Sequence, residues 1–92
     1  LQLQGKRALV TGASYGLGYA CAKALAEEGV SIAICSRDEE KVTGAASQIS
    51  EQTRMKTVGI SADLTKEDDL KRVFTDAEKF LGGIDILVVS TG

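Results

Sequence analysis

The sequence contains no histidine, proline or tryptophan, and its two cysteines are Cys21 and Cys35. The absence of histidine excludes histidine-based catalytic triads, histidine proton shuttles and histidine-ligated metal sites. Two cysteines cannot make a disulfide framework or a four-cysteine zinc site. We therefore expect both cysteines to be small apolar core residues of a protein from a reducing compartment.

The sequence also lacks long apolar runs and a strong charge of either sign. No run approaches the roughly 18 apolar residues of a membrane span, and the polar first residues do not form a signal peptide. With 11 Lys and Arg against 13 Asp and Glu, the net charge is -2, so the positive field of a nucleic-acid-binding surface is missing. The composition predicts one small globular domain in the cytoplasm, with neither a nucleic acid nor a membrane as partner.

What the sequence does contain is a regular alternation of short apolar runs and amphipathic segments. The apolar runs cover residues 6–11, 30–35, 57–62 and 84–89, and each has the length of a strand. Helical periodicity fills the gaps between them. This alternation predicts the α/β class, with a doubly wound parallel sheet that helices cover on both faces. Right-handed crossovers favour the strand order 3-2-1-4, with a crevice beyond the carboxyl ends of the first and fourth strands.

The expected helices have recognisable starts, ends and core faces. The first begins at Gly16 and ends at Gly29. The second begins after Ser36 or Asp38, either of which is a suitable N-cap, and the third begins at Thr65. The expected core faces are Leu17, Ala20, Cys21, Ala24 and Leu25 on the first helix, Val42, Ala45, Ala46 and Ile49 on the second, and Leu70, Val73, Phe74, Ala77 and Leu81 on the third.

A glycine-rich loop, Thr11-Gly12-Ala13-Ser14-Tyr15-Gly16-Leu17-Gly18, joins the first strand to the first helix. Gly12 allows a sharp turn, Gly16 leaves the backbone open to a pyrophosphate, and Gly18 allows the helix to pack closely on the sheet. The N–H groups at the helix start favour an anion, to which the Ser14 hydroxyl can also donate. No Lys follows in the pattern of a nucleotide-hydrolysing P-loop. The spacing therefore predicts a pyrophosphate-binding loop rather than a turn that binds nothing.

This spacing, with three residues between the first two glycines, resembles the signature of the short-chain dehydrogenase/reductase family. Asp63-Leu64 resembles the family's adenine-contacting pair, and residues 84–89 leading to Gly92 resemble its fourth strand and the turn that follows. Among members, the pattern looks most like the 3-oxoacyl-carrier-protein reductases. The resemblance implies a Rossmann-like fold in which residues 1–92 form the N-terminal dinucleotide-binding part of a single domain, with the rest of that domain outside this chain.

The end of the fourth strand departs from the family pattern. Members commonly have Asn-Ala-Gly where this chain has Ser90-Thr91-Gly92, so the structural role of that Asn is in question here. The hydroxyls of Ser90 and Thr91 remain candidate donors to the ribose, against the alternative of a plain strand end. Tyr15 stands where NADP-binding members often carry Arg, and it either covers the adenosine phosphate or is an exposed loop residue. The cofactor site that this implies consists of Gly12, Ser14, Tyr15, Gly16, Leu17, Gly18, Ser36, Arg37, Asp63, Leu64, Ser90, Thr91 and Gly92.

The residues after the second strand bear on the choice of cofactor. An NAD enzyme places an acid there to accept hydrogen bonds from the ribose 2′-hydroxyl. This chain has Ser36-Arg37, and the guanidinium can fork onto a 2′-phosphate to which the serine donates. Asp38 follows in a position that suits helix capping better than ribose contact. The sequence therefore favours NADP(H), with NAD(H) as the alternative. Asp63 also has two interpretations, adenine contact and a cap of the turn that follows, of which adenine contact is preferred.

Tyr19 and Lys23 have the Tyr-x-x-x-Lys spacing of this family's catalytic pair, in which the Lys lowers the Tyr pKa. They follow the glycine loop directly, whereas the family's pair comes much later in the chain, after a catalytic Ser. On a helical projection both residues lie opposite the expected core face. They are therefore predicted to face solvent and to have no catalytic role.

Together these features predict an oxidoreductase whose longer parent transfers hydride between a nicotinamide and a carbonyl or alcohol carbon of a small-molecule substrate. The 92-residue chain is expected to bind the cofactor without catalysing the reaction, because no catalytic residue is identified in it. The strand at 84–89 would be an open edge, which predicts self-association as a homo-oligomer. Two alternatives remain: a non-catalytic NAD(P)-binding sensor module, and a structural α/β domain whose glycines only make turns.

Overall fold

The computed structural model describes residues 3–13 and 15–90. Strands and helices alternate along these residues, as the hydropathy pattern predicts. The strands are β1 (Arg7–Thr11), β2 (Ser31–Ser36), β3 (Thr57–Ser61) and β4 (Ile86–Val89), and the helices are α1 (Gly16–Glu27), α2 (Glu39–Thr53) and α3 (Glu67–Leu81). Each strand falls within two residues of its expected bounds.

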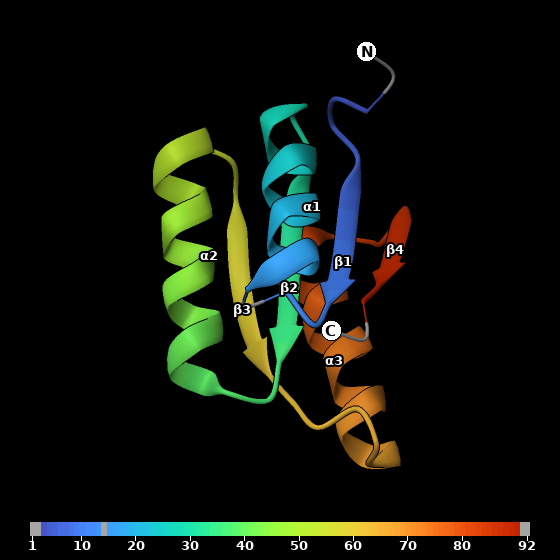
Figure 1. The fold of residues 1–92 in the computed structure, drawn as a ribbon. Coiled ribbons are helices and arrows are strands. Elements are labelled where there is room, and N and C mark those ends of the chain that lie inside the picture. Colours follow the sequence, from blue (N-terminus) through green and yellow to red (C-terminus); the bar gives the residue numbers. More distant parts are fainter. Residues whose placement is uncertain (1–2, 14, 91–92) are drawn as a thin grey trace.

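The strands form one parallel sheet in the order β3-β2-β1-β4 (Figure 1). This order confirms the predicted 3-2-1-4 arrangement. The winding direction reverses after β3, so β4 pairs with the free side of β1. The carboxyl ends of parallel strands meet at one edge of the sheet, and the reversal places a crevice at that edge.

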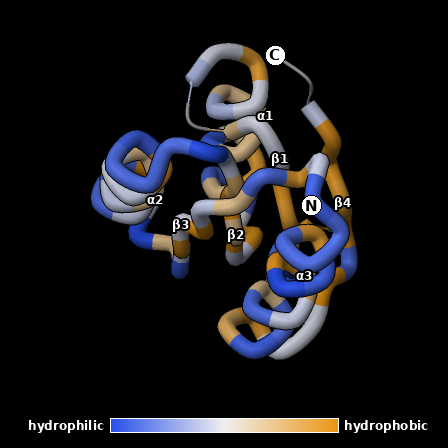
Figure 2. The backbone as a smooth tube through the Cα atoms, turned by 90° about the horizontal axis from the view of Figure 1, so that it is seen from below, coloured by the Kyte–Doolittle hydropathy of each residue, from blue (hydrophilic) through white to orange (hydrophobic). Residues whose placement is uncertain are grey.

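Helices cover both faces of the sheet, and a separate apolar core fills each side. Helices α1 and α2 lie over one face and α3 over the other, as the view in Figure 2 shows. The core under α1 and α2 contains Val10 and Ile34, and the core under α3 contains Leu9 and Cys35. Successive side chains of β1 and β2 enter opposite cores, which explains why these strands are apolar at nearly every position.

The face of α1 that contacts the sheet differs from the predicted one. The buried residues of α1 are its small ones, Gly18, Ala22 and Ala26. The residues expected in the core are exposed or only partly buried: Leu17, Ala20, Cys21, Ala24 and Leu25. Leu17 is 82% exposed. The helix lies so close to the sheet that a Cβ on Gly18 would be 2.4 Å from the Gly12 carbonyl oxygen. The prediction was wrong because it centred the core face on Leu17 and Leu25, whereas the close approach at Gly18 turns the face with Gly18, Ala22 and Ala26 toward the sheet.

The core faces of the other two helices follow the prediction more closely. On α2 the predicted residues are all buried: Val42, Ala45, Ala46 and Ile49. On α3, Val73 and Ala77 are buried, and Phe74 and Leu81 pack against the same core. Leu70 is the exception, since it is 39% exposed at the start of the helix.

The start of α2 settles one open prediction, and the start of α3 corrects another. Asp38 is the N-cap of α2, because its Oδ1 accepts a hydrogen bond of 3.0 Å from the Lys41 N–H. Helix α3 begins at Glu67 with Lys66 as its N-cap and without a side-chain cap bond. The prediction that α3 begins at Thr65 was therefore wrong.

Polar contacts that the sequence did not predict join the start of β1 to the loop before β4. Asp85 Oδ2 accepts from the Arg7 backbone N–H and from Arg7 Nε, each at 3.0 Å, and Arg7 Nη1 donates to the Gly82 carbonyl oxygen at 2.9 Å. The hydrogen bond from Arg7 lowers the pKa of Asp85, and the same bond raises the pKa of Arg7. These contacts hold β4 beside β1.

The outer side of β4 is open within the described residues. Leu87 is 50% exposed and Val89 is 67% exposed. Leu87 is paired with Leu9, whose side chain lies in the core under α3, so Leu87 also lies on that side of the sheet. Across residues 3–13 and 15–90, none of the helices is long and apolar enough to cross a membrane.

Candidate functional site

A cavity of about 550 Å³ opens where the carboxyl ends of the strands meet. This size suits a small-molecule ligand. Its lining residues are Thr11, Gly12, Tyr15, Cys35, Ser36, Arg37, Asp38, Lys41, Ala62, Asp63, Leu64, Thr65, Val89 and Ser90. They come from the ends of β1, β2 and β4, from the loops that follow the four strands, and from the first turn of α2. The predicted residues Gly12, Tyr15, Ser36, Arg37, Asp63, Leu64 and Ser90 are therefore gathered around one space.

The turn after β1 brings three backbones into close contact. Gly12 has φ +65°, and its N–H donates to the Cys35 carbonyl oxygen at 2.8 Å. A Cβ on Gly12 would lie 2.4 Å from the Ser90 carbonyl oxygen at the end of β4. The same turn carries the Gly12 carbonyl against which Gly18 packs. Gly12 thus joins β1, β2 and β4 at the switch point, a role for which only glycine has room.

The start of α1 is open to solvent and has no anionic side chain of its own. Gly16 has φ +66°, and a Cβ built on it would meet nothing within 4 Å. The N-cap residue Tyr15 has an extended backbone and makes no side-chain cap bond, and the first turn contains no acidic residue. The uncapped N–H groups and the positive end of the helix are therefore available to an anion. This cradle fits the pyrophosphate of a dinucleotide.

The turn after β2 and the first turn of α2 carry two cations, Arg37 and Lys41, and one acid that lines the cavity, Asp38. Ser36, Arg37, Asp38 and Lys41 all line the cavity. The Ser36 hydroxyl donates to the Asp38 carbonyl oxygen at 3.4 Å, while the Asp38 carboxylate accepts from the Lys41 N–H. The Ser61 hydroxyl fixes this turn from β3 by donating to the Arg37 carbonyl oxygen at 3.2 Å. The acid is thus engaged with the helix start, as the sequence predicted.

Asp63 holds the turn after β3. Its Oδ1 accepts from the N–H and the Oγ1 of Thr65, at 3.0 Å and 2.6 Å. These hydrogen bonds lower the pKa of Asp63, and the positive charge of Arg37 lowers it further. The structure therefore gives Asp63 the turn-capping role that the sequence analysis ranked second. The adenine contact stays a prediction, because Asp63 and Leu64 also line the cavity.

The remaining predicted residues have different positions. The Ser90 N–H donates to Thr11 Oγ1 at 3.3 Å, which ties the end of β4 to the end of β1. Tyr15 lines the cavity and is 65% exposed, as expected of an exposed loop residue, and its contact with the adenosine phosphate stays a prediction. Gly16, Leu17 and Gly18 do not line this cavity. Ser14, Thr91 and Gly92 lie outside the described residues, so their predicted contacts stay predictions.

The Cys35 thiol lies at the floor of the cavity and is fully buried. Burial raises the pKa of this thiol to about 11, so it is protonated near neutral pH. Cys35 is therefore a core residue, as predicted, and not a nucleophile. Cys21 is only partly buried, which corrects its expected position on the core face of α1.

Tyr19 and Lys23 lie on α1 and do not line the cavity. The prediction that Tyr19 faces solvent was wrong, because its ring packs against the core between α1 and α2. The Tyr19 hydroxyl donates to Gln48 Oε1 on α2 at 2.9 Å. Lys23 is partly buried. The error follows from the misplaced core face of α1, and Tyr19 has a structural position between two helices.

Lys41 is a cavity residue that the sequence analysis missed. The signal was available, because Asp38 as N-cap places Lys41 in the first turn of α2, next to Ser36-Arg37. Thr65 was considered only as a cap, although it lines the cavity beside Asp63. Both residues are distant from the glycine motif in the sequence, and the sheet order brings them to it.

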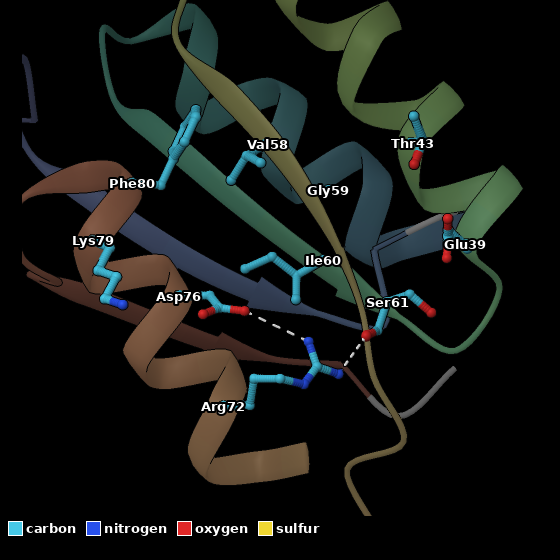
Figure 3. Close-up of a pocket in the computed structure, with 10 residues that line it drawn as sticks. All are labelled: Glu39, Thr43, Val58, Gly59, Ile60, Ser61, Arg72, Asp76, Lys79 and Phe80. Carbon is cyan, nitrogen blue, oxygen red and sulfur yellow. Dashed lines mark hydrogen bonds and ion pairs between the residues drawn. The ribbon is translucent and has the colours of Figure 1, made fainter.

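A second cavity of about 600 Å³ lies along the outer edge of β3, between α2 and α3 (Figure 3). Arg72 Nη2 donates to the Ser61 carbonyl oxygen at 2.7 Å, and Arg72 pairs with Asp76 at 3.6 Å. Lys79 also lines this cavity. Charged side chains over an edge strand protect it from pairing with another chain. This cavity contains none of the predicted cofactor residues, and it lies away from the switch point.

Comparison with known proteins places this geometry in a family. The family model described as short chain dehydrogenase matches residues 6–92. Glucose 1-dehydrogenase of Gluconobacter oxydans is 39% identical over 88 residues, which cover 96% of this chain and 33% of that protein. The 3-oxoacyl-[acyl-carrier-protein] reductase of Aquifex aeolicus is 34% identical over 92 residues, which cover all of this chain and 37% of that protein. The chain thus spans about a third of the length of these curated relatives.

Solved structures agree with the sequence relatives. L-sorbose reductase from Gluconobacter frateurii, in complex with NADPH and L-sorbose, superposes with a TM-score of 0.92 at 30% identity over 97% of this chain and 34% of that protein. Hydroxysteroid dehydrogenase from Escherichia coli has a TM-score of 0.92 at 30% identity over 98% of this chain and 38% of that protein. The chain belongs to the short chain dehydrogenase family, and its described residues form the NAD(P)-binding Rossmann region of that family.

Proposed function

We propose that this chain is the N-terminal, cofactor-binding portion of a single Rossmann domain in an NADP(H)-dependent oxidoreductase. The parent protein would transfer hydride between the nicotinamide and a carbonyl or alcohol carbon of a small-molecule substrate. One observation carries the proposal: the Gly12 turn after β1, which leads to the start of α1, and the Ser36-Arg37 turn after β2 line the same cavity. A dinucleotide needs both an anion cradle and a group that binds its adenosine ribose.

Different residues of this chain would bind different parts of the cofactor. The backbone amides at Gly16, Leu17 and Gly18 would hold the pyrophosphate, since the start of α1 has no side-chain cap. Arg37 and Ser36 would contact the 2′-phosphate of the adenosine ribose. When bound, the nicotinamide supplies or accepts the hydride, and the protein's part is to bind and orient it.

NADP(H) is favoured over NAD(H) by the state of the nearby acid. An acid that selects NAD must be free to accept hydrogen bonds from the ribose 2′-hydroxyl. Asp38 Oδ1 is engaged by the Lys41 N–H at the start of α2. The L-sorbose reductase structure contains NADPH, which supports the same choice.

The substrate is proposed only as a class. The relatives named above act, by their names, on a sugar and on a 3-oxoacyl thioester, so similarity alone does not choose between them. The 3-oxoacyl-thioester substrate that the sequence resemblance implied stays a prediction. We assign no catalytic residue to the described part of the chain, because Tyr19 donates to Gln48 and lies outside the cavity.

The test is a titration of the 92-residue chain with NADPH and with NADH, followed by nucleotide fluorescence. We expect tighter binding of NADPH, and we expect Arg37→Ala to weaken NADPH more than NADH. Lys79→Ala removes the same charge from the β3 edge and serves as the control. Equal losses for the two nucleotides in Arg37→Ala would contradict the assignment of NADP(H). If neither NADPH nor NADH bound, the nucleotide site itself would be contradicted.

We also propose that the chain self-associates through β4. This strand is an open edge whose Leu87 and Val89 are half to two-thirds exposed. Exposed strand edges with apolar side chains favour pairing with another strand. Sedimentation equilibrium is expected to show a species heavier than the 9.7 kDa chain. A single species of monomer mass at all concentrations would contradict this.

A further inference from the structure

We propose that Tyr19 is a positioning residue that fixes the start of α1 for the pyrophosphate of the cofactor. This inference rests on the proposed function, because it concerns the backbone amides at Gly16, Leu17 and Gly18. It goes beyond that function because Tyr19 does not line the cavity and would act only through the helix start. Two observations support it: the first turn of α1 is weakly held by its own hydrogen bonds, and the Tyr19 side chain joins this turn to α2.

The first turn of α1 is held less tightly by backbone hydrogen bonds than the first turns of the other helices. Its N-cap carbonyl oxygen, on Tyr15, accepts from the Tyr19 N–H at 3.5 Å. The equivalent bonds at the N-caps of α2 and α3 measure 2.9 Å and 3.0 Å. A hydrogen bond of 3.5 Å is longer than the usual range and is weak. Tyr15 also makes no side-chain cap bond, so the start of α1 depends on other contacts.

Few side chains at the start of α1 can supply those contacts. Gly18 and Ala22 touch the sheet but are small, and Leu17 is 82% exposed. Among residues 16–22, all of which the structure describes, Tyr19 is the one large side chain that packs against the core under α1 and α2. The Tyr19 ring is therefore the main side-chain contact that holds the first two turns of α1 in place.

Helix α2, against which the Tyr19 side chain lies, is itself packed closely on the sheet. The Tyr19 hydroxyl donates to Gln48 Oε1 on α2 at 2.9 Å. The backbone of α2 is so near β3 that a Cβ on Gly59 would lie 2.6 Å from the Val42 carbonyl oxygen. Closely packed elements of this kind move little relative to each other. A ring held against α2 therefore limits the tilt and rotation of α1.

The tilt and rotation of α1 set the direction of the N–H groups at its start. These groups bind the oxygens of a pyrophosphate only when they point toward them. Where the arrangement that binds is populated only part of the time, the apparent affinity falls in proportion to its population. Loss of the Tyr19 ring should therefore lower the affinity for every ligand that contains a pyrophosphate, with or without a 2′-phosphate.

Four variants separate positioning from stability. Tyr19→Ala removes the ring, and Tyr19→Phe retains the ring and loses only the bond to the exposed Gln48. Leu25→Ala is the matched control, because Leu25 is also partly buried and packs against the same core from α1. It lies about 9 Å further along the helix. Both alanine variants should lower the melting temperature, because each loses apolar packing. Tyr19→Leu keeps part of that packing and is used if Tyr19→Ala does not fold.

The experiment measures the affinity of the unmodified chain and of each folded variant for NADPH, NADH and adenosine 2′-monophosphate, which has no pyrophosphate. We expect Tyr19→Ala to weaken NADPH and NADH by the same factor, about three- to tenfold, and Tyr19→Leu to cause a smaller loss of the same kind. Adenosine 2′-monophosphate should bind as before. Tyr19→Phe should stay within about twofold of the unmodified chain, because water replaces an exposed hydrogen bond. Leu25→Ala should change none of the three affinities.

The outcomes distinguish this inference from the proposed function. If Tyr19→Ala, or Tyr19→Leu in its place, binds both dinucleotides as the unmodified chain does, the role of Tyr19 is wrong and the nucleotide site stands. If Leu25→Ala weakens them equally, the loss comes from lower stability and the positioning role is wrong. An equal loss for adenosine 2′-monophosphate would also overturn it, because the start of α1 would not be the part affected. If the unmodified chain binds neither dinucleotide, the proposed function fails and the inference fails with it.

Discussion

The starts of α1 and α2 lie at the same edge of the sheet, and their chemistry is opposite. Helix α2 supplies its own anions, since Asp38 caps it and Glu39 and Glu40 occupy its first turn. Helix α1 has no side-chain cap, no acid in its first turn, and an open glycine at Gly16. Both helices begin with N–H groups that have no partner within the helix, and both starts are the positive ends of their helices. The difference is that α2 supplies its own acceptor and acids, whereas α1 leaves the N–H groups at its start without a side-chain cap.

The two turns also differ in the conformational entropy that they lose on folding. The turn before α1 and the first turn of the helix contain three glycines, Gly12, Gly16 and Gly18, and glycine loses more conformational freedom on folding than other residues. The turn before α2 is made of ordinary polar residues and satisfies itself. A turn that is both costly and unsatisfied has a reason beyond folding. This difference is consistent with the proposed anion site at the start of α1.

The largest expected effect comes from filling the space at Gly12. Gly12→Ala would force a Cβ to within 2.4 Å of the Ser90 carbonyl oxygen at a φ of +65°. We expect the free energy of unfolding to fall by about 3 kcal/mol or more. Gly16→Ala is the matched variant, because its φ is +66° but its surroundings are empty. It should cost only about 1–2 kcal/mol of backbone strain.

Denaturant unfolding of both variants measures this difference. If Gly12→Ala and Gly16→Ala lost the same free energy of unfolding, backbone strain alone would explain both losses. The contact between Gly12 and Ser90 would then contribute nothing to the loss. In the folded Gly16→Ala variant, NADPH affinity should still fall if the pyrophosphate binds as proposed, because the added methyl group would stand in its way.

The next largest effect is expected from giving α1 a side-chain cap like that of α2. Tyr15→Asp would place a capping carboxylate at the N-cap of α1, where the unmodified chain has no cap bond. We expect the chain to gain about 0.5–2 kcal/mol of stability, the usual worth of such a cap. Nucleotide binding should be lost by more than about tenfold, because a fixed carboxylate repels the pyrophosphate. Tyr15→Asn caps without charge and separates the two effects. Unchanged NADPH affinity in Tyr15→Asp would contradict the anion site at α1.

A smaller effect is expected when α2 loses its own cap. Asp38→Ala removes the acceptor of the Lys41 N–H and should cost about 1 kcal/mol of unfolding free energy. Asp38→Asn keeps an acceptor of similar capping strength and should cost a few tenths of that value at most. Thermal melting of the pair measures the difference. Equal destabilisation by both substitutions would mean that the charge of Asp38, and not its hydrogen bond, stabilises α2.

The smallest effect is expected at low pH and concerns Asp63 in the turn after β3. The pKa of Asp63 is lowered from its ordinary value of 3.8, mainly by its hydrogen bonds with Thr65. A carboxyl with a lowered pKa in the folded state contributes stability that is complete above pH 3.8 and is lost as pH falls through the lowered value. Asp63→Asn should therefore unfold with less change between pH 4 and pH 2 than the unmodified chain. Unfolding at these two pH values, with Asp68→Asn as a control on α3, tests the sign. If Asp63→Asn kept the pH dependence of the unmodified chain, the stabilising role of the Asp63 carboxylate would be contradicted.

Much of the fold could be predicted because it depends on local patterns. The apolar runs fixed the strands, and the right-handed crossover rule led to the observed order β3-β2-β1-β4. The separate roles of Gly12 and Gly18 also followed from spacing, and the structure gives both the close backbone contacts expected of them. The Asp38 cap was one of two candidates, and the structure selected it.

The errors that concern α1 share one cause, which is the short distance between α1 and the sheet. Hydropathy chose Leu17 as a core residue, whereas contact with the sheet selected Gly18, Ala22 and Ala26. The same rotation of the helix brought Tyr19 into contact with α2. Periodicity finds the face of a helix from apolarity, and it contains no information on how closely that face approaches its neighbour.

The sequence by itself determined the element order, the glycine turn and the Ser36-Arg37 pair, because each depends on residues that are close in the chain. The tertiary structure decided which side chains share the cavity. Lys41, Asp63, Thr65 and Ser90 are brought together only when parallel strands from distant parts of the chain end at the same edge. The physical reason is that charge recognition depends on distances through space, and the sheet sets those distances.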